Sequence, residues 1–492
     1  MMKQAPPERL ARGTLLAAAS AALLFVAGCA DMSGIDSKAI LRAPQSVGLG
    51  SDAASTVRVS DIAQNSVDAR WWTQFGDAQL NGLIDAALQG NPSLKVAQAR
   101  VAKSLANVDV AGAAGKPTLG AGLDANRQLY SENFIYPAPL GGSIQNTATL
   151  QLNGSWELDF FGKNRTALEA SVGASNAAAA DAAAAQVMLT TRIARTYIDW
   201  ARLDGMQDVA RRTLSQREET LKLVRDRVSA GLDTNLELRQ SQAGLPEARL
   251  RLETLNEQVA LTQHALDALV GQPNATQALK PPQLAQLKPA GVLPQIPADL
   301  LGRRADVVAA RWRVEAASKD AANAKTLFYP NVDLVAFAGF QSIGFDQLIK
   351  SSSLQWGVGP AIRLPIFEGG KLRANLRGKQ ADLDAAVESY NGTVLDAVRD
   401  VADQVTSAKS IERQQVQQRE GEVAAEGAYD IAVQRYRAGL GTYLNVLTAE
   451  TQVLVQRRQG VDLAARVLDN QVALAHALGG GYQDPAAQTA SR

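Results

Sequence analysis

The segment Ser155-Trp156-Glu157-Leu158-Asp159-Phe160-Phe161-Gly162-Lys163 is where this chain changes its period. Before it, polar and apolar residues alternate over 147–156, which predicts a β-strand with one polar and one apolar face. After it, an alanine-rich run without proline extends to Arg227, with apolar residues three and four positions apart. At 1.5 Å per residue this run predicts a helix of about 100 Å, far longer than the helices of ordinary globular domains.

Composition narrows the possible classes of protein. The chain has 492 residues and is 46% hydrophobic, which is enough for a large core or several domains. Its 50 basic and 49 acidic residues nearly cancel, so no nucleic-acid partner is expected. Only 5% of the residues are aromatic, which is low for a soluble enzyme of this length.

The N-terminus predicts export from the cytoplasm. Arg9 and Arg12 precede an apolar run over 15–27, the pattern of a secretory signal peptide. The run is too short for a membrane-spanning helix. It leads through small residues to Cys29, the only cysteine, so an intrachain disulfide is excluded. An ordinary signal peptide followed by an incidental cysteine is one interpretation.

The other interpretation of this segment is a lipoprotein. Small residues followed directly by cysteine resemble the bacterial lipoprotein cleavage box, which implies that Cys29 becomes the first mature residue and carries lipid. In the sorting pattern of such lipoproteins, aspartate after the cysteine retains the protein at the inner membrane. Ala30 at this position fits the outer membrane.

The remaining pattern predicts the same order of elements twice: helix, strand, strand, long helix, helix. Expected helices cover about 79–114, 163–230, 234–270, 300–328, 371–437 and 442–478, and expected strands 118–128, 147–156, 331–341 and 354–364. A shift of 208 lays Gly162-Lys163 on Gly370-Lys371 and Ala230-Gly231-Leu232 on Ala438-Gly439-Leu440. A shift of 213 lays Pro117 on Pro330. The chain is therefore interpreted as an internal duplication.

This duplication sets the expected domain organisation. The junctions between strands and helices are expected at Pro117, Gly162, Pro330, Pro365 and Gly370. The expected parts are a signal peptide (1–28), a lipidated extended arm (29–70), a first repeat (71–270), a proline-rich surface linker (271–299), a second repeat (300–478) and a loose, flexible tail (479–492).

The strands suggest a pore made by several copies of the chain. Each has the length and the two-faced pattern of a transmembrane β-strand. A sheet in lipid must close on itself, and four strands are too few, because about eight make the smallest filled barrel. Three copies would supply twelve strands around a water-filled lumen. The alternative is a soluble α+β protein with amphipathic hairpins.

At this point the chain resembles the TolC-like outer membrane efflux family, in particular the lipidated outer-membrane factors of tripartite pumps. The resemblance covers roughly 60–480 and differs at Ala78 and Ala305, where the family often has proline. The matching segments are Trp71-Trp72, Phe75-Gly76-Asp77, Leu83-Ile84, Asn91-Pro92-Ser93-Leu94, Trp156 to Gly162, Leu300-Leu301-Gly302-Arg303-Arg304-Ala305-Asp306 and Tyr436-Arg437-Ala438-Gly439.

The resemblance implies an α+β membrane protein: a trimeric twelve-stranded β-barrel, four strands per chain, continued by a long α-helical periplasmic barrel. It implies a tunnel constriction after the second distal turn, at Leu444, Thr448 and Thr451. The family has aspartate and arginine at the two threonine positions, so a cation-selective ring and an ionic lock are not expected there. An apolar and hydrogen-bonded constriction is expected instead. Leu444 as an ordinary packing leucine is the alternative, and the orientation of Glu450 is left open.

Residues for catalysis are not recognisable. His264 and His476 each stand alone on a predicted helix, so no metal site and no cofactor are expected. Gly369-Gly370-Lys371 does not complete a phosphate-binding loop, because Pro365 replaces the first glycine and Leu372 the serine or threonine. Without a nucleotide site, the energy for transport has to come from a partner.

The sequence therefore predicts a non-enzymatic outer-membrane exit duct for small toxic or hydrophobic compounds. The expected partners are two further copies of the chain, outer-membrane lipid, a periplasmic adaptor bound at the Gly231 and Gly439 turns, and an inner-membrane pump. A duct for type I protein secretion and a structural lipoprotein that spans the envelope are the alternatives.

Overall fold

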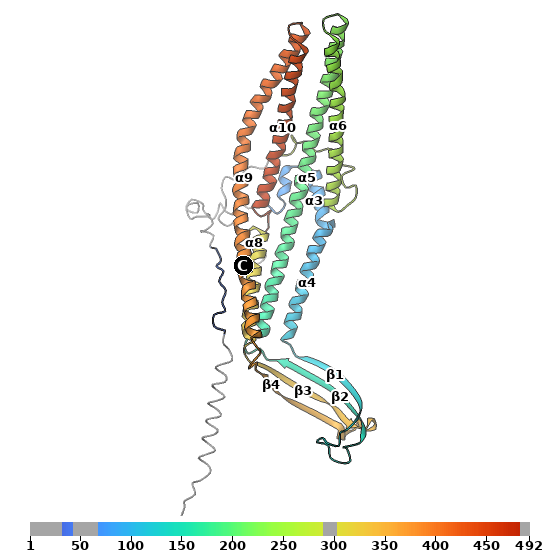
Figure 1. The fold of residues 1–492 in the computed structure, drawn as a ribbon, viewed down its shortest axis with the longest axis vertical. Coiled ribbons are helices and arrows are strands. Elements are labelled where there is room, and N and C mark those ends of the chain that lie inside the picture. Colours follow the sequence, from blue (N-terminus) through green and yellow to red (C-terminus); the bar gives the residue numbers. More distant parts are fainter. Residues whose placement is uncertain (1–31, 43–66, 289–302, 483–492) are drawn as a thin grey trace, which may run out of the picture. The chain divides into compact units, whose positions relative to one another are not determined.

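The computed structural model describes residues 32–42, 67–288 and 303–482 (Figure 1). The predicted signal peptide and Cys29 lie outside these residues. The elements are η2 (Trp71–Phe75), α3 (Ala78–Gly90), α4 (Pro92–Ala114), β1 (Thr118–Leu129), β2 (Ile144–Glu157), α5 (Lys163–Ser229), α6 (Asn235–Val270), α8 (Ala305–Thr326), β3 (Asn331–Ile343), η3 (Phe345–Gln347), η4 (Ser351–Ser353), β4 (Leu354–Arg363), α9 (Lys371–Arg437) and α10 (Tyr443–Ala477).

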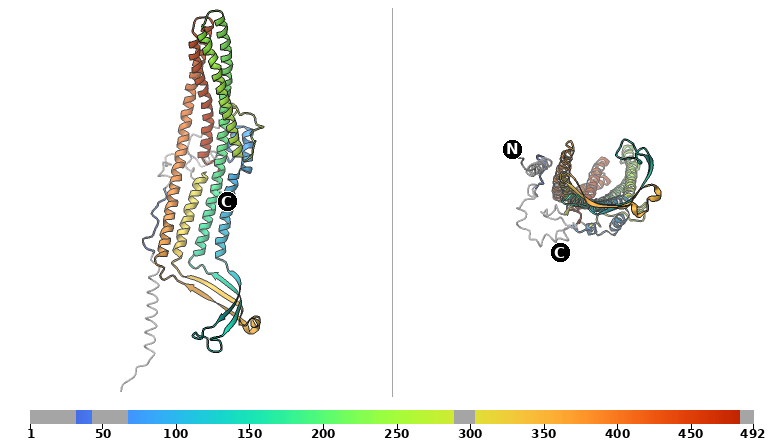
Figure 2. Two further views of the ribbon diagram at one scale, coloured as in Figure 1. Left: turned by 45° about the vertical axis from the view of Figure 1, so that its right-hand side comes forward. Right: turned by 90° about the horizontal axis from the view of Figure 1, so that it is seen from below.

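The four strands form one antiparallel sheet in the order β1-β2-β3-β4 (Figures 1 and 2). The register brings the alternating apolar residues of all four strands onto one face, because side chains alternate between the faces of a strand. One row across the sheet consists of Leu123, Leu150, Phe340 and Leu354. This face is open to the surroundings, as Trp356 with 73% exposure illustrates.

The opposite face of the sheet is mostly polar. The Gln355 Nε2 donates a hydrogen bond of 3.0 Å to the Gln151 Oε1, and both residues pair in register with Gly339 of the strand between them. A Cβ at Gly339 would lie 2.6 Å from the Gln151 Cα, so only glycine allows this close approach. The two glutamine side chains therefore meet above a position that has no side chain.

The predicted helix over 79–114 is wrong in one respect, because it is two helices. α3 ends at Gly90 and α4 begins at Pro92, since proline disfavours a helical conformation of the preceding residue. Asn91 occupies the break. Its Oδ1 accepts from the Ser93 N–H at 2.8 Å, and its Nδ2 donates to the Leu269 carbonyl at 2.7 Å.

Ala78 and Ala305, the two departures from the family pattern, are both the first residue of a helix. Proline is favoured at this position because its fixed φ suits the helix and its missing N–H would be unpaired there in any case. Alanine is the best helix former, so it replaces proline without loss of the helix start. At α3, the Asp77 carboxylate caps the helix by accepting from Gln79 N–H at 2.7 Å.

Two compact units make up the chain, and each contains parts of both sequence repeats. The first comprises 1–41, 102–177 and 310–390, and includes the sheet. The second comprises 42–101, 178–309 and 391–492. The boundary between the two sequence repeats therefore does not coincide with the boundary between the two compact units.

The main hydrophobic core belongs to the second unit and is rich in aromatic residues. Trp72 of η2 and Tyr197 and Trp200 of α5 are each no more than 2% exposed. Leu287 also joins this core, although most residues of the described part of the predicted surface linker, 271–288, are exposed. The Lys288 N–H donates to the Phe75 carbonyl at 3.1 Å and holds the segment in place.

The predicted loose tail is wrong for its first residues. Gly479 and Gly480 are buried and have positive φ, which glycine adopts without strain. A Cβ at Gly479 would lie 1.9 Å from the Arg303 carbonyl oxygen. The backbone therefore packs too closely for any other residue. Residues 483–492 lie outside the described range.

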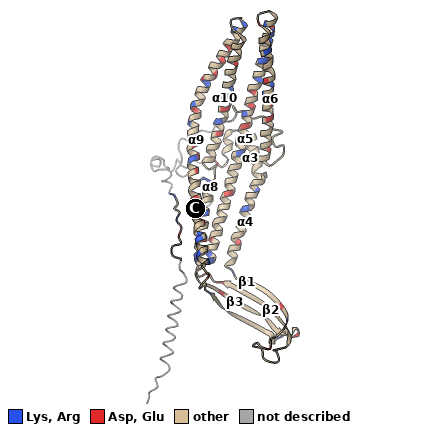
Figure 3. Cartoon of the chain, viewed as in Figure 1, with Lys and Arg blue, Asp and Glu red and all other residues tan. Residues whose placement is uncertain are grey.

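Charged residues of both signs alternate along the helices, and the sheet carries few of them (Figure 3). Within 32–42, 67–288 and 303–482, no helix combines the length and the apolarity needed to cross a bilayer.

Candidate functional site

The two helical hairpins α5–α6 and α9–α10 end in turns of the same geometry. Gly231 and Gly439 have φ of +73° and +74°, in the left-handed region that favours glycine. The following leucines, Leu232 and Leu440, are 64% and 68% exposed. The closing hydrogen bonds also correspond: Gly231 N–H to Val228 carbonyl and Leu232 N–H to Arg227 carbonyl in the first turn, Gly439 N–H to Tyr436 carbonyl and Leu440 N–H to Arg435 carbonyl in the second.

A buried cluster joins the two hairpins next to these turns. The Arg227 Nε donates to the Asp233 Oδ2 at 2.8 Å, and both side chains are only 11% exposed. The Tyr436 hydroxyl of the other hairpin donates to the same Asp233 oxygen. The Arg227 guanidinium also lies 4.7 Å from the centre of the Tyr436 ring. We name Arg227, Asp233 and Tyr436 the tip cluster.

Hydrogen bonding from Arg227 lowers the pKa of the Asp233 carboxyl, against the opposing effect of burial. Burial, followed by the bond to Asp233, raises the pKa of the Tyr436 phenol. Asp233 is therefore ionised and Tyr436 protonated at neutral pH, which are the states that their hydrogen bond needs.

The three predicted constriction residues lie on one exposed face of α10, because they are four and three positions apart. Leu444 is 64% exposed, and Thr448 and Thr451 are exposed as well. The Thr448 hydroxyl donates to the Leu444 carbonyl at 2.9 Å, and the Thr451 hydroxyl to the Leu447 carbonyl at 2.9 Å. Each threonine hydroxyl thus donates its hydrogen bond within its own helix. The threonine side chain exposes a methyl group and an oxygen atom that can still accept a hydrogen bond.

Glu450 lies on the opposite, buried face of α10, which answers the question that the sequence left open. Its side chain is 8% exposed, and its Oε1 accepts from the Arg217 Nε of α5 at 2.9 Å. Arg217 also contacts Glu247 of α6 at 2.9 Å. Glu450 therefore connects helices and does not add a charge beside Leu444.

The five predicted junction residues are found where the strands meet the helices. Pro117 and Pro330 directly precede β1 and β3, and Pro365 follows β4. Gly162 and Gly370 directly precede the two long helices, with φ of +77° and +84°. Each junction thus changes direction at a residue that is either fixed in φ or free of a Cβ.

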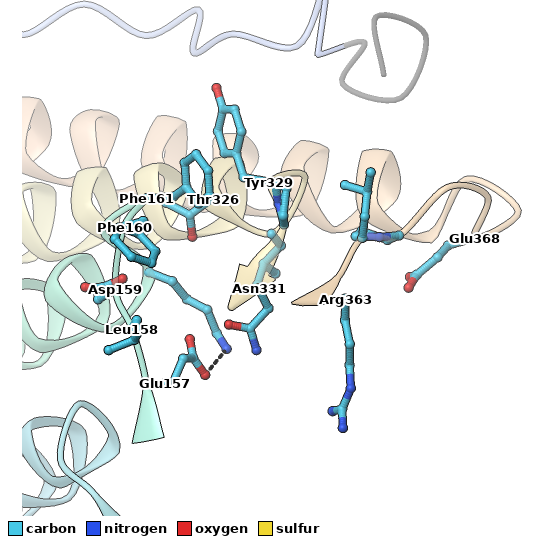
Figure 4. A pocket seen from close by; sticks show the side chains of 15 residues that line it. Glu157, Leu158, Asp159, Phe160, Phe161, Thr326, Tyr329, Asn331, Arg363 and Glu368 are labelled. Carbon is cyan, nitrogen blue, oxygen red and sulfur yellow. Dashed lines mark hydrogen bonds and ion pairs between the residues drawn. The ribbon is translucent and has the colours of Figure 1, made fainter. Parts of the chain in front are cut away.

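Side-chain contacts within the segment 156–163 stabilise the junction after β2. The Asp159 Oδ2 accepts from the Arg165 N–H at 2.8 Å and so caps the start of α5. The Lys163 Nζ forms an ion pair with the Glu157 Oε2 at 3.0 Å (Figure 4). The Phe161 ring stacks on Tyr329 with centroids 5.1 Å apart. A cavity of about 340 Å³ lies among these residues.

His476 lies beside an ion cluster formed by Arg304, Asp306 and Asp400. Arg304 is 6% exposed and contacts Asp306 at 2.7 Å and Asp400 at 3.3 Å. Burial, with a further contribution from Arg304, lowers the pKa of His476. In the part of the chain that the structure describes, no group of three or more His, Cys, Asp or Glu could hold a metal ion. Arg304 and Asp306 of this motif thus form ion pairs at the start of α8.

Sequence reasoning missed the tip cluster and the Arg217–Glu450 pair. One signal was available for the first: under the shift of 208, Asp233 corresponds to Gly441 and Tyr436 to Val228, so the two repeats differ where their hairpins meet. No such signal marks Arg217, which resembles any other arginine on a charged helix.

Known proteins share both the sequence and the fold. The family model described as "Outer membrane efflux protein" matches residues 83–272 and 296–480. The fusaric acid resistance protein FusA of Burkholderia cepacia is 38% identical over 379 residues, which are 75% of this chain and 70% of that protein. The multidrug resistance outer membrane protein MdtP of Escherichia coli K12 is 32% identical over 424 residues, 84% of this chain and 87% of that protein.

Among solved structures, the outer membrane protein VceC of Vibrio cholerae has a TM-score of 0.79 and 38% identity, covering 85% of this chain and 100% of VceC. The outer-membrane channel OprN has a TM-score of 0.80 and 28% identity, covering 85% of this chain and 93% of OprN. The predicted fold class, a duplicated chain with four strands and long helices as in trimeric outer-membrane channels, is confirmed. With its two matched segments, its four-stranded sheet and its paired helical hairpins, this chain belongs to the outer membrane efflux protein family.

Proposed function

We propose that this chain is the outer-membrane exit duct of a tripartite efflux pump. It conducts small toxic or hydrophobic compounds passively from a periplasmic adaptor and an inner-membrane pump to the exterior. The main support for this proposal is the sheet, which has one continuous apolar face and two open edges, in a member of the outer membrane efflux family.

The open edges support assembly from several copies. β1 and β4 are each paired on one side only, so their outer backbone groups lack partners within the described chain. Each such group costs several kcal/mol in lipid, which forces closure. β1 of one copy and β4 of the next can satisfy each other. Three copies give twelve strands, more than the eight or so that fill a barrel solid, and leave a lumen.

The two faces of the sheet indicate which side of the closed barrel contacts lipid and which side lines the lumen. The apolar face, with Leu119, Leu123, Trp356 and Val358 all more than 60% exposed, suits contact with acyl chains. The polar face, which includes Gln151 and Gln355, suits a water-filled lumen. This arrangement supports an outer-membrane location with three copies around one lumen.

The distal turns and the face after them supply the periplasmic end. Leu232 and Leu440 present two similar exposed contact points for a periplasmic adaptor at the Gly231 and Gly439 turns. Leu444, Thr448 and Thr451 form the constriction of the tunnel, where leucine contributes apolar closure and the threonines contribute no charge. Lipid on Cys29 attaches the chain to the outer membrane in addition to the sheet.

The names of the relatives favour small-molecule efflux over protein secretion or a structural role, since FusA and MdtP are both described as resistance proteins. Deletion of the gene is expected to increase sensitivity to drugs or detergents with normal envelope morphology. Purified protein is expected to conduct ions in planar bilayers. A sealed, non-conducting protein would support the structural alternative, and loss of an exported polypeptide on deletion would support secretion.

A further inference from the structure

The N-terminal arm is seated in a specific slot on the first compact unit. Ile35 is 5% exposed and packs in a cluster with Ala324 and Phe328 before β3 and Leu376 of α9. Met32 and Leu372 pack against the same cluster. The segment 32–41 thus runs beside α9 with its N-terminal end toward the start of that helix (Figure 2).

One carboxylate fixes the register of the arm. The Asp384 Oδ1 accepts three hydrogen bonds, from the Ser37 hydroxyl at 2.6 Å, the Lys38 N–H at 2.9 Å and the Ala39 N–H at 3.0 Å. Three donors on one oxygen of an ionised acceptor define both the position and the direction of the segment. Further along, the Arg42 N–H donates to the Asn391 Oδ1 at 3.0 Å.

The slot exists in one repeat only. Under the shifts that relate the repeats, Phe328 corresponds to Gly115, Asp384 to Asn176 and Asn391 to Ala183. Three of the residues that contact the arm are therefore replaced in the first repeat by ones that lack the ring, the charge or the side-chain oxygen, whereas Ala324 and Leu376 correspond to the same residue types, Ala111 and Leu168. The aromatic ring, the carboxylate and the amide that contact the arm are thus present in the second repeat and absent from the first.

We infer that this slot is a dock that fixes the height of the lipid anchor relative to the strand–helix junction. The inference rests on the proposed lipidation of Cys29. Asp384 is thirteen residues into α9, which is about 20 Å above the helix start at 1.5 Å per residue. Cys29 precedes Ser37 by eight residues, which span at most about 26–29 Å.

The reach of the extended chain exceeds the height by about 6–9 Å, so a chain held at Asp384 can bring the lipid of Cys29 to the level where α9 meets β4 and only about 6–9 Å further. The occupant of the dock is this chain's own arm. The arm places the lipid of Cys29 in the bilayer that surrounds the sheet. The anchor and the apolar face of the sheet thereby enter the same leaflet at a fixed spacing.

Trypsin cleavage after Lys38 tests the dock in the full-length protein. Asp384→Asn and Ile35→Ala are each expected to increase the rate at which a new N-terminus appears at Ala39 by tenfold or more. Asp382→Asn and Ile40→Ala are the matched controls, since Asp382 is exposed and pairs with Lys379, and Ile40 is 80% exposed. Equal cleavage rates for all four variants and the unchanged protein would overturn the dock.

Fluorescence quenching tests the height. Single thiols introduced by Ser33→Cys or Lys38→Cys carry a fluorophore in nanodiscs made with brominated phospholipid. Stronger quenching at position 33 than at 38, with the difference at least halved by Asp384→Asn and kept by Asp382→Asn, supports the inference. Equal quenching at both positions overturns it. Labelling of Cys29 itself in the unchanged protein would show a free thiol and refute lipidation, while the trypsin comparison would still decide on the dock.

Discussion

Tyr436 and Asp233 are 203 residues apart in the chain, and a hydrogen bond from the phenol of the first to the carboxylate of the second joins the two helical hairpins. Arg227 completes the tip cluster from the same hairpin as Asp233. The turns proposed to contact the adaptor are therefore held together within one chain by a buried polar contact.

Tyr436→Phe removes the phenol and leaves Asp233 with one donor fewer. We expect a loss of about 1–3 kcal/mol in the free energy that holds the hairpins together, because the hydrogen bond is to a buried charged group. Hydrogen exchange should accelerate at 227–236 and 435–444. Tyr329→Phe, which removes a hydroxyl at the strand–helix junction, is the control. Unchanged exchange in Tyr436→Phe would show that the hydroxyl does not hold the hairpins together.

The tip cluster should make stability depend on pH in a defined direction. The pKa of Asp233 is lowered in the folded protein, so its contribution is complete above the unfolded value of about 4 and is lost as the pH falls through the lower folded value. The difference in midpoint temperature between the unchanged protein and Asp233→Asn should be constant from about pH 5 to pH 8. It should shrink below about pH 4. A difference that grows on acidification contradicts the assignment.

Glu450→Gln should be strongly destabilising. It removes one charge of a buried pair and leaves Arg217 with the exposed Glu247, and breaking such a pair costs about 3–5 kcal/mol. Asp208→Asn, which breaks an exposed pair with Arg211, should cost less than about 1 kcal/mol. The midpoint temperatures of thermal unfolding, measured at the same scan rate, compare the two variants. Similar midpoints would mean that the Arg217–Glu450 pair carries no special weight.

Leu444→Ala should increase single-channel conductance in planar bilayers, because it removes apolar volume from the proposed constriction. Leu236→Ala is a close control: Leu236 corresponds to Leu444 in the first repeat and is similarly exposed, at 62% against 64%. Conductance should be unchanged in Leu236→Ala. Equal effects of the two substitutions would support the alternative that Leu444 is an ordinary packing residue.

Gly231→Ala and Gly439→Ala should each cost about 1–2 kcal/mol, because a Cβ is disfavoured at their positive φ. No heavy atom lies within 4 Å of the added Cβ at either turn, so the effect comes from the backbone. Gly427→Ala inside α9 also meets open space but should stabilise by about 0.5–1 kcal/mol. Midpoints that move in the same direction for all three would refute the left-handed turns.

The sequence predicted the elements that depend on local pattern. Alternation over 147–156 and its absence after Gly162 were enough to place β2 and α5, because the periods of strand and helix are properties of neighbouring residues. The break at Asn91-Pro92 was missed although proline marked it, because the apolar spacing continues on both sides. The capping glycines at 231 and 439 were found because their conformation needs no distant partner.

The sequence by itself determined the duplication, the two-faced strands, the long helices and the turns between them. Only the tertiary structure decided that Glu450 is buried on Arg217, that Asp233 binds Tyr436 and that Asp384 holds the arm. The physical reason is that a charged residue on a helix has the same local signature whether water or another helix covers it. Its partner is chosen by packing between segments that lie hundreds of residues apart.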